Sequence, residues 1–225
     1  MTNTGSRAKP RRLAVFDLDG TLSRADTFGP FVLGLLRRHP ARVLRVPLLL
    51  LPVIGYVLRL MDRGGLKGAI LHVLFAGLSR AEVGQFARQY AQTVVPDRLF
   101  PAALAALRKH LADQDHVVLL SASPDLYVPD IGAALGVDET ICTQVRWNGE
   151  QLDGRLAGLN RRDQEKLRVL EGLKQQHPGL SAIAYGNSRA DLPHMFRCEQ
   201  AVYVNAAPAL GRELGERGVQ CVNWR

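Results

Sequence analysis

The chain has 225 residues, of which 47% are hydrophobic and 22% are charged, and its formal net charge is +8. This composition is typical of a soluble globular protein, and the length allows a core domain with a smaller insert. The positive charge fits a nucleic-acid, membrane or anionic-substrate partner. The basic residues are dispersed and no nucleic-acid motif accompanies them, which argues against nucleic-acid binding.

The amino-terminal segment and the cysteines give information on the cellular location of the protein. Residues 1–10 include Ser, Gly, Lys and Pro and are expected to form a disordered basic tail. Residues 1–12 are polar and basic with no apolar signal-peptide region behind them, so no signal peptide is expected. The three cysteines are scattered and lack metal-ligand spacing, which favours buried free thiols in a reducing cytoplasm over disulfides or a zinc site.

The first informative stretch is residues 13–22, with the sequence LAVFDLDGTL. Its four leading apolar residues predict a buried parallel strand, and Asp17 and Asp19 follow where that strand ends. Both carboxylates can face one site only if the chain turns at Asp17, which Gly20 allows. They can then converge on a hard cation such as Mg²⁺. The alternative for this stretch alone is an ordinary aspartate-rich turn.

Residues 43–60 are the most unusual part of a long helix-compatible region, because four consecutive leucines lie between two prolines. The prolines and the arginines at positions 45 and 59 disfavour a simple membrane-spanning helix. Three interpretations of residues 37–60 remain: a buried helical hairpin, an element on the membrane surface, and a true span. The flanking arginines are compatible with contact to anionic lipid headgroups, and equally with the solvent-exposed face of a soluble helix pair.

Two conventional amphipathic helices are expected next, at about 77–95 and 100–112. Ser79 and Glu82 form a plausible capping box for the first helix. Apolar residues recur at helical spacing in both, so core packing is expected for both.

A second buried strand, residues 116–120, ends in Ser121, Ala122 and Ser123. Serine hydroxyls at this place, together with the amides of a following helix, can bind phosphate oxygens. Taken alone, a serine after a strand is more often a turn residue or a helix cap.

Residues 137–158 predict a short strand and a hairpin, and a helix then begins near residues 160–166. Lys166 lies in the first turn of that helix, where a lysine opposes the helix dipole and is usually a solvated surface residue. Arg161 and Arg162 lie close to it but precede the apolar helical pattern.

The last polar loop follows a strand at 182–185 and contains Asn187 and Asp191, and further strands are expected near 201–204 and 219–222. The alternation of strands and helices predicts an α/β fold, with a Rossmann-like parallel sheet flanked by helices and one crevice at the strand ends.

The domain boundaries follow from the long separation of the first two strands. The gap between Asp17 and Ser121 is too long for a loop, so residues 24–102 are expected to form a helical cap inserted after the first strand. The core domain then comprises residues 11–23 and 103–225.

These four stretches, in this order, resemble the motifs of the haloacid dehalogenase superfamily, whose members mostly transfer phosphoryl groups through an aspartyl-phosphate. The resemblance implies that Asp17 is the nucleophile, Asp19 the general acid/base and Lys166 the neutralising lysine. It also implies two further sets: substrate contacts at Ser121, Ser123, Thr21 and Asp26, and Mg²⁺ ligands at Asp17, Asp19, Asn187 and Asp191.

The pattern departs from the family at Asn187, where the usual residue is aspartate. An amide oxygen is an acceptable ligand for a hard cation, but it lacks the attraction of a full negative charge. Asn187 therefore predicts a weaker metal affinity than the usual aspartate would give. Asp191 can act directly, through water, or by holding Lys166.

The insert after the first strand resembles branch IB of the superfamily, which includes phosphoserine phosphatases. Residues 26–29 and 37–60 further resemble phosphatidylglycerophosphatase C and its bacterial relatives. Asp26 stands where phosphoserine phosphatases place a carboxylate that reads the substrate ammonium group, and it is also a good helix N-cap. The sequence does not indicate the oligomeric state.

The resemblance implies a magnesium-dependent phosphomonoester hydrolase, in which Asp17 attacks phosphorus and Asp19 first protonates the leaving alkoxide and then activates water. The expected substrate is a lipid phosphate such as phosphatidylglycerophosphate. The expected location is the cytoplasm, with peripheral contact to the anionic inner face of the membrane. The alternatives are a soluble small-metabolite phosphatase, such as a phosphoserine phosphatase, and a noncatalytic phosphate-binding relative.

Overall fold

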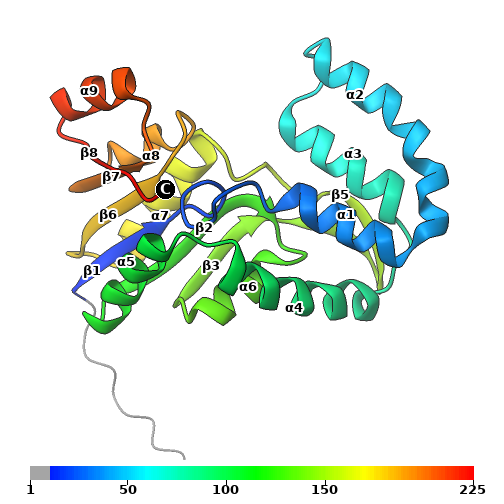
Figure 1. Cartoon of the computed structure of the whole chain (residues 1–225), viewed down its shortest axis with the longest axis horizontal. Coiled ribbons are helices and arrows are strands. Elements are labelled where there is room, and N and C mark those ends of the chain that lie inside the picture. Colours follow the sequence, from blue (N-terminus) through cyan, green and yellow to red (C-terminus); the bar gives the residue numbers. More distant parts are fainter. Residues whose placement is uncertain (1–10) are drawn as a thin grey trace, which may run out of the picture.

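The computed structural model describes residues 11–225, so the tail expected at residues 1–10 lies outside the described part of the chain. Its core is a parallel sheet of six strands in the order β3-β2-β1-β6-β7-β8 (Figure 1). The strands are β1 (Arg12–Phe16), β2 (His116–Pro124), β3 (Glu139–Thr143), β6 (Ser181–Gly186), β7 (Gln200–Val204) and β8 (Gln220–Val222). The predicted fold class is confirmed.

Alternate side chains of the central strands divide between two hydrophobic cores, as the period of a strand requires. On one face, Phe16 and Leu119 pack with α5 (Pro101–Ala112) and α6 (Val128–Leu135). On the other, Val15 and Val118 pack with α7 (Gln164–Gln176), α8 (Leu192–Met195) and α9 (Pro208–Glu216). Helices on both faces leave the strand ends as the place where polar groups meet.

Between β1 and α5 the chain forms only helices. They are α1 (Phe28–Arg38), the 3₁₀ segment η1 (Pro40–Leu49), α2 (Leu50–Val57), α3 (Arg63–Phe75) and α4 (Arg80–Asp97). The predicted capping box is present at the start of α4, where Ser79 and Glu82 bond each other's backbone amides. In Figure 1, α2 and α3 form a lobe that stands away from the sheet.

A hairpin from farther along the chain, β4 (Val145–Asn148) and β5 (Gln151–Leu156), packs against α3. Two glycines let the backbones come close. A Cβ on Gly154 would lie 2.5 Å from the amide nitrogen of His72, and a Cβ on Gly68 would lie 3.3 Å from that of Leu156. The lobe is therefore built from two segments that lie far apart in the sequence.

No residue of η1 or α2 is buried, so the interpretation of residues 37–60 as a buried hairpin is wrong. Apolar residues occur on all sides of this segment, and its contact with α3 along one edge cannot cover them. Leu44 is 84% exposed, Leu51 77% and Leu60 82%. We refer to residues 43–60 as the apolar ridge.

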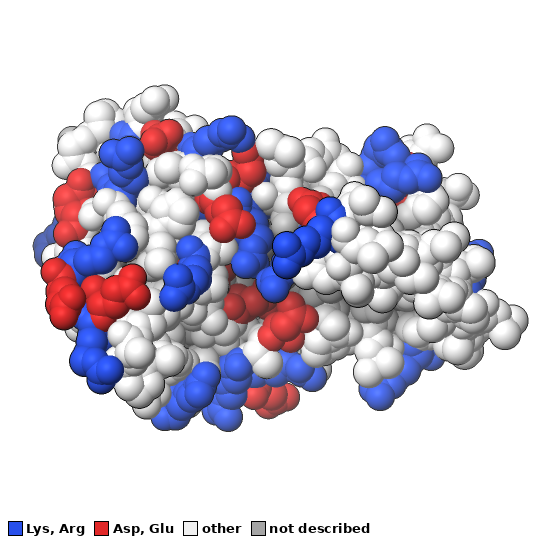
Figure 2. Space-filling model, turned by 90° about the horizontal axis from the view of Figure 1, so that it is seen from above, with Lys and Arg blue, Asp and Glu red and all other residues white. Residues whose placement is uncertain are grey.

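The residues Pro40–Val57 are long and apolar enough to cross a membrane, by length and composition alone, with a mean hydropathy of 1.5. The segment starts as a 3₁₀ helix and contains Pro47, which limits the regular helical hydrogen bonding that a span requires. Figure 2 shows this end of the molecule as a largely uncharged surface with Lys and Arg at its margins.

The three cysteines are free, as expected. Only Cys142 is buried, however, while Cys198 is half-buried and Cys221 is exposed. The expectation that all three are buried is therefore wrong.

Candidate active site

The predicted site residues come together at the carboxyl ends of β1, β2 and β6. Asp17 directly follows β1, Ser121 and Ser123 lie in the last part of β2, and Asn187 directly follows β6. The backbone amide of Asp17 donates to the carbonyl of Tyr185, 3.0 Å away, which fixes the first aspartate to the neighbouring strand. The sheet itself therefore positions the crevice.

Lys166 is the centre of the charged network. Its Nζ lies 2.6 Å from Asp17 Oδ1 and 2.7 Å from Asp191 Oδ1, and its side chain is almost fully buried. It reaches these carboxylates from the first turn of α7. A solvated surface position, the usual place for such a lysine, is thus excluded for Lys166.

Burial and charge set the protonation of this network. Burial raises the pKa of Asp17 to about 6, although the charge of Lys166 opposes the shift. Burial acts in the same direction on Asp191, but Lys166 outweighs it and lowers the pKa of Asp191 to about 2. The lysine, desolvated yet held by two carboxylates, has a raised pKa and stays charged.

Asp19 is held between the start of α1 and the end of β2. Its Oδ1 accepts hydrogen bonds from the amide and the hydroxyl of Thr27, at 2.7 and 2.6 Å. Its Oδ2 accepts from the hydroxyl of Ser123 at 2.6 Å. The sequence predicts a phosphate contact for Ser123, but the structure uses this hydroxyl to position Asp19. Thr27 is a positioning residue that the sequence reasoning missed.

Thr21 and Ser121 lie beneath the floor of the crevice and are fully buried. The hydroxyl of Thr21 donates to Asp17 Oδ2 at 2.8 Å, and Ser121 Oγ accepts from the amide of Ser123 at 3.0 Å. Both predicted substrate contacts therefore support other site residues, and the structure gives neither a surface that opens on the cavity.

Oxygen atoms gather beside Asp17 in a way that fits a hard cation. Asn187 Oδ1 lies 3.3 Å from the Thr21 hydroxyl, which is itself bonded to Asp17. The amide group of Asn187 lies over Gly20, where a Cβ would come within 2.0 Å of its nitrogen. Carboxylate and amide oxygens are ligands that Mg²⁺ accepts, so Asp17 and Asn187 are the side chains placed to hold it.

Asp191 has another task in this structure. Its Oδ1 accepts from Lys166, and its Oδ2 accepts from the amides of Asn187 and Ser188 and from the Ser188 hydroxyl. With both oxygens engaged, Asp191 holds the lysine and the loop that carries Asn187. Of the alternatives for Asp191, the structure favours the one in which it holds Lys166 over direct metal coordination.

The crevice opens into a cavity of about 260 Å³ whose lining contains both acidic and basic side chains, the acidic ones being Asp17, Asp19, Asp26 and Asp191. Its basic lining residues are Arg63, Lys67, Arg162 and Lys166. Lys67 reaches across from α3, where its Nζ donates to the carbonyl of Ala122 at 2.8 Å and burial lowers its pKa. Lys166 is paired with Asp17 and Asp191, so Arg63, Lys67 and Arg162 are the further cations at this cavity that can attract a multiply charged anion such as phosphate.

The sequence reasoning missed Lys67 and Arg63, and it considered Arg162 only as an alternative to Lys166. One signal is available: Arg63 and Lys67 are four residues apart, which places two cations on one face of a helix whose other residues are mainly apolar. Nothing in the spacing says that this face meets the second strand, so only the fold gives the two residues a role.

Asp26 lies just before α1 and lines the catalytic cavity, and its contact with a substrate stays a prediction. Its Oδ2 accepts from the amide of Gly29 at 2.8 Å, which caps the first turn of α1. The same residue lines the catalytic cavity, so its carboxylate is also within the reach of a bound substrate.

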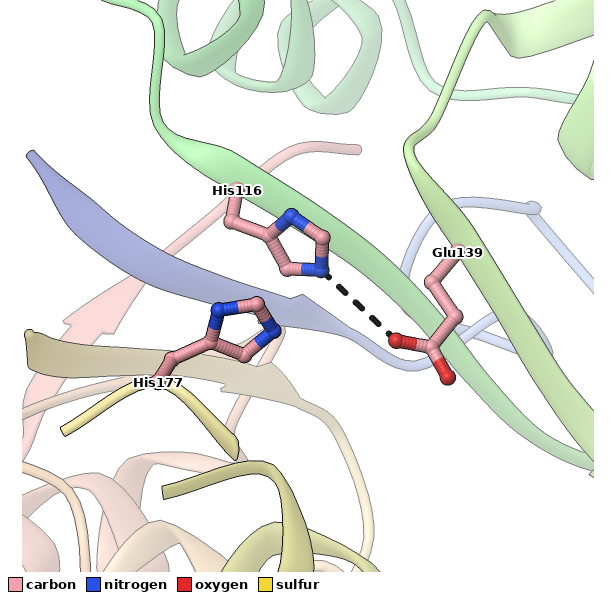
Figure 3. A group of neighbouring side chains, drawn as sticks. All are labelled: His116, Glu139 and His177. Carbon is pink, nitrogen blue, oxygen red and sulfur yellow. Dashed lines mark ion pairs between the residues drawn. The ribbon is translucent and has the colours of Figure 1, made fainter. Parts of the chain in front are cut away.

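A second group of possible metal ligands lies at the other end of β2 (Figure 3). The rings of His116 and His177 pack 4.3 Å apart, and His116 Nε2 lies 3.6 Å from a carboxylate oxygen of Glu139. Because His116 begins β2 and Ser121 lies near the end of that strand, this group is separate from the catalytic crevice. Its two imidazoles also differ from the oxygen donors beside Asp17.

Solved structures with this fold include phosphatases. The chain is similar to a protein of unknown function from Bordetella pertussis Tohama I, with 25% identity, a TM-score of 0.78, and coverage of 96% of this chain and 100% of that one. It is also similar to a probable phosphoserine phosphatase from Vibrio cholerae, with 16% identity, a TM-score of 0.69, and coverage of 96% and 63%. These similarities show that the chain shares the fold of these proteins.

Sequence comparison gives the family. The haloacid dehalogenase-like hydrolase family matches residues 14–195. Protein CicA of Caulobacter vibrioides is 33% identical over 198 residues, which cover 84% of this chain and 83% of that protein. The chain therefore belongs to the haloacid dehalogenase-like hydrolase family, as its motifs predict. This is a family of hydrolases.

Proposed function

We propose that this enzyme is a magnesium-dependent phosphomonoester hydrolase that forms an aspartyl-phosphate and acts on a lipid phosphate, such as phosphatidylglycerophosphate, at an anionic membrane surface. The observation that carries the chemistry is the buried contact of 2.6 Å between Asp17 and Lys166 at a cavity lined by four cations. A carboxylate held in this way is ready to attack a phosphorus atom whose oxygens the cations attract.

The chain's own residues supply the steps. A carboxylate oxygen of Asp17 attacks phosphorus, the bond to the leaving oxygen breaks, and Asp19 gives that oxygen its proton. Asp19 then takes a proton from water as the water attacks the aspartyl-phosphate, which releases phosphate and restores Asp17. Lys166 offsets the negative charge throughout. Mg²⁺, when bound by Asp17 and Asn187, supplies further positive charge at the phosphoryl oxygens.

The lipid part of the proposal is supported by the composition of residues 27–61. This stretch contains five arginines and no aspartate or glutamate. Its apolar residues are exposed on the ridge. An exposed apolar surface bordered by arginines complements a membrane that contains anionic lipids, and peripheral contact requires no spanning helix.

Phosphoserine is the second candidate substrate, and one observation favours it. The carboxylate of Asp26 lines the catalytic cavity, where it can pair with a substrate ammonium group. In this alternative, the apolar ridge has no part in substrate recognition.

The experiment compares release of phosphate from phosphatidylglycerophosphate in mixed micelles with release from phosphoserine in buffer, both with Mg²⁺. We expect faster turnover of the lipid and a loss on the order of 10⁴-fold or more in Asp17→Asn, since Asp17 carries the covalent step. Asp26→Asn serves as the matched acidic control: it should leave lipid turnover nearly unchanged.

Each part of the proposal has its own contrary outcome. Substantial metal-dependent activity in Asp17→Asn would overturn the covalent chemistry. Preference for phosphoserine, with strong loss in Asp26→Asn, would leave the chemistry intact and make the second candidate correct.

A further inference from the structure

A second cavity, of about 560 Å³, lies beside the catalytic one and belongs to no step of the proposed chemistry. Pro52 of α2, Ala69 of α3 and Leu156 of β5 line three of its sides. Gly64 and Gly68 keep the α3 side free of larger side chains. The volume falls within the range of roughly 300–1,000 Å³ that is usual for small-molecule sites.

The polar residues of this cavity already bond other parts of the protein. His72 bonds the carbonyl of Asp153 at 2.7 Å through Nδ1 and the guanidinium of Arg155 at 3.1 Å through Nε2. Asp62 accepts from the amide of Gly65 at 2.7 Å. A ligand in the cavity would therefore gain mainly from its apolar wall, as a hydrocarbon does.

The two cavities adjoin at Asn160, which lines both. The α3 helix also connects them, because Arg63 lines the catalytic cavity and the next residue, Gly64, lines the apolar one. At the outer end, Leu159 is 64% exposed and Pro52 belongs to the apolar ridge. A molecule with its phosphate at Asp17 can thus extend past Asn160 into the apolar cavity toward the ridge.

We propose that this cavity binds a hydrocarbon chain of the phosphomonoester substrate. The inference rests on the proposed function and adds a specificity site to it. Lys67 and Arg63 hold the charged end, and the α3–β5 cavity holds the apolar end. The enzyme then selects single substrate molecules by chain length, independently of any attachment of the ridge to a surface.

The test measures kcat/KM for n-alkyl phosphates from two to ten carbons, each at monomeric concentrations, so that no micelle or vesicle is present. For the wild-type enzyme, we expect kcat/KM to rise up to about fourfold for each methylene that enters the cavity. Ala69→Phe fills the cavity and should abolish this rise while leaving the rate with the two-carbon ester nearly unchanged. Ala69→Leu is the milder variant if the larger side chain prevents folding.

Ala105→Phe is the matched control, because Ala105 is exposed on α5 outside both cavities, and it should keep the wild-type rise. Equal rates at all chain lengths in the wild type would overturn the inference and leave the proposed hydrolase standing. A rise that persists in folded Ala69→Phe or Ala69→Leu would also overturn it. If the wild type hydrolyses neither these esters nor the lipid, the proposed function fails as well.

Discussion

The catalytic crevice and the apolar ridge follow opposite rules. In the crevice, Asp17, Lys166 and Asp191 are buried charged groups, and hydrogen-bond donors hold the carboxylates: Lys166 holds Asp17 and Asp191, and Thr27 and Ser123 hold the half-buried Asp19. On the ridge, large apolar residues are exposed and have little to pack against. Groups that are costly to bury are inside, and groups that are costly to expose are outside.

This difference in burial implies that the crevice and the ridge contribute differently to activity and to folding stability. The crevice has to be preorganised, because reaction geometry depends on fixed hydrogen bonds. The ridge contributes little to folding stability, because its side chains remain exposed in the folded chain. Changes in the crevice should therefore affect both activity and stability, whereas changes on the ridge should affect only contact with a surface.

The largest effect is expected for Lys166→Met. This substitution keeps most of the length of the side chain but leaves Asp17 and Asp191 buried without their cation. We expect loss of activity by about 10³-fold or more and destabilisation by roughly 3–5 kcal/mol. Urea unfolding and phosphate release measure the two effects. An active, equally stable Lys166→Met protein would contradict the central place given to this lysine.

The ridge offers the contrasting prediction. Leu44→Ser combined with Leu51→Ser should reduce binding to vesicles containing phosphatidylglycerol by about tenfold or more, since both side chains are largely exposed. Stability and hydrolysis of a soluble ester should not change. Leu33→Ser, on an exposed leucine of α1 outside the ridge, is the control for vesicle flotation. Equal vesicle binding by the wild type, the Leu44→Ser/Leu51→Ser double variant and Leu33→Ser would exclude the ridge as the contact surface.

A smaller effect is expected from the substitution Asn187→Asp, in an enzyme whose turnover depends on Mg²⁺. Removal of Mg²⁺ with EDTA should abolish turnover, and Asn187→Asp should lower the Mg²⁺ concentration for half-maximal rate several-fold, because a carboxylate adds attraction that the amide lacks. Titration of activity with Mg²⁺ gives the result. A requirement for more Mg²⁺ in Asn187→Asp would show that the amide is not a metal ligand.

The smallest effect concerns His194, which is buried beside the crevice. Burial lowers its pKa to about 4, whereas the unfolded chain takes up the proton near the ordinary value of 6.5. The unfolded state therefore binds more protons in this range, so stability falls as the pH drops from about 6.5 toward 4. His194→Gln should remove up to about 2 kcal/mol of the loss between pH 7 and pH 5. Urea unfolding of the wild type and of His194→Gln at pH 7 and pH 5 tests this, because the other titrating groups contribute equally to both proteins.

The core could be predicted because its pattern is local. Apolar strands followed by polar loops are readable from the sequence, and the crevice at their carboxyl ends follows from parallel topology. Asp17, Asp19, Lys166 and Asn187 are therefore found by matching these strand ends, in order, to the motifs of the family. The functions of Ser123 and Asp191 are not, because hydrogen-bond partners depend on which loops come to lie side by side.

The cap was harder to predict for a different reason. The same apolar residues suit a buried helix and an exposed one, so composition does not decide whether residues 43–60 are covered. The packing of the β4–β5 hairpin against α3 is a contact between segments about 80 residues apart, and no periodicity encodes it. Lys67 escapes prediction for the same reason, since its role depends on where α3 is placed.

The close approach of Gly154 to His72 constrains how this enzyme can diverge. A side chain at position 154 would meet the backbone of α3, so no change of rotamer could accommodate it. A lineage that replaces this glycine must also reshape the helix that carries Lys67 and the cavity wall. In sequences descended from this one, we therefore expect the hairpin and α3 to vary together, even though the whole second strand is encoded between them.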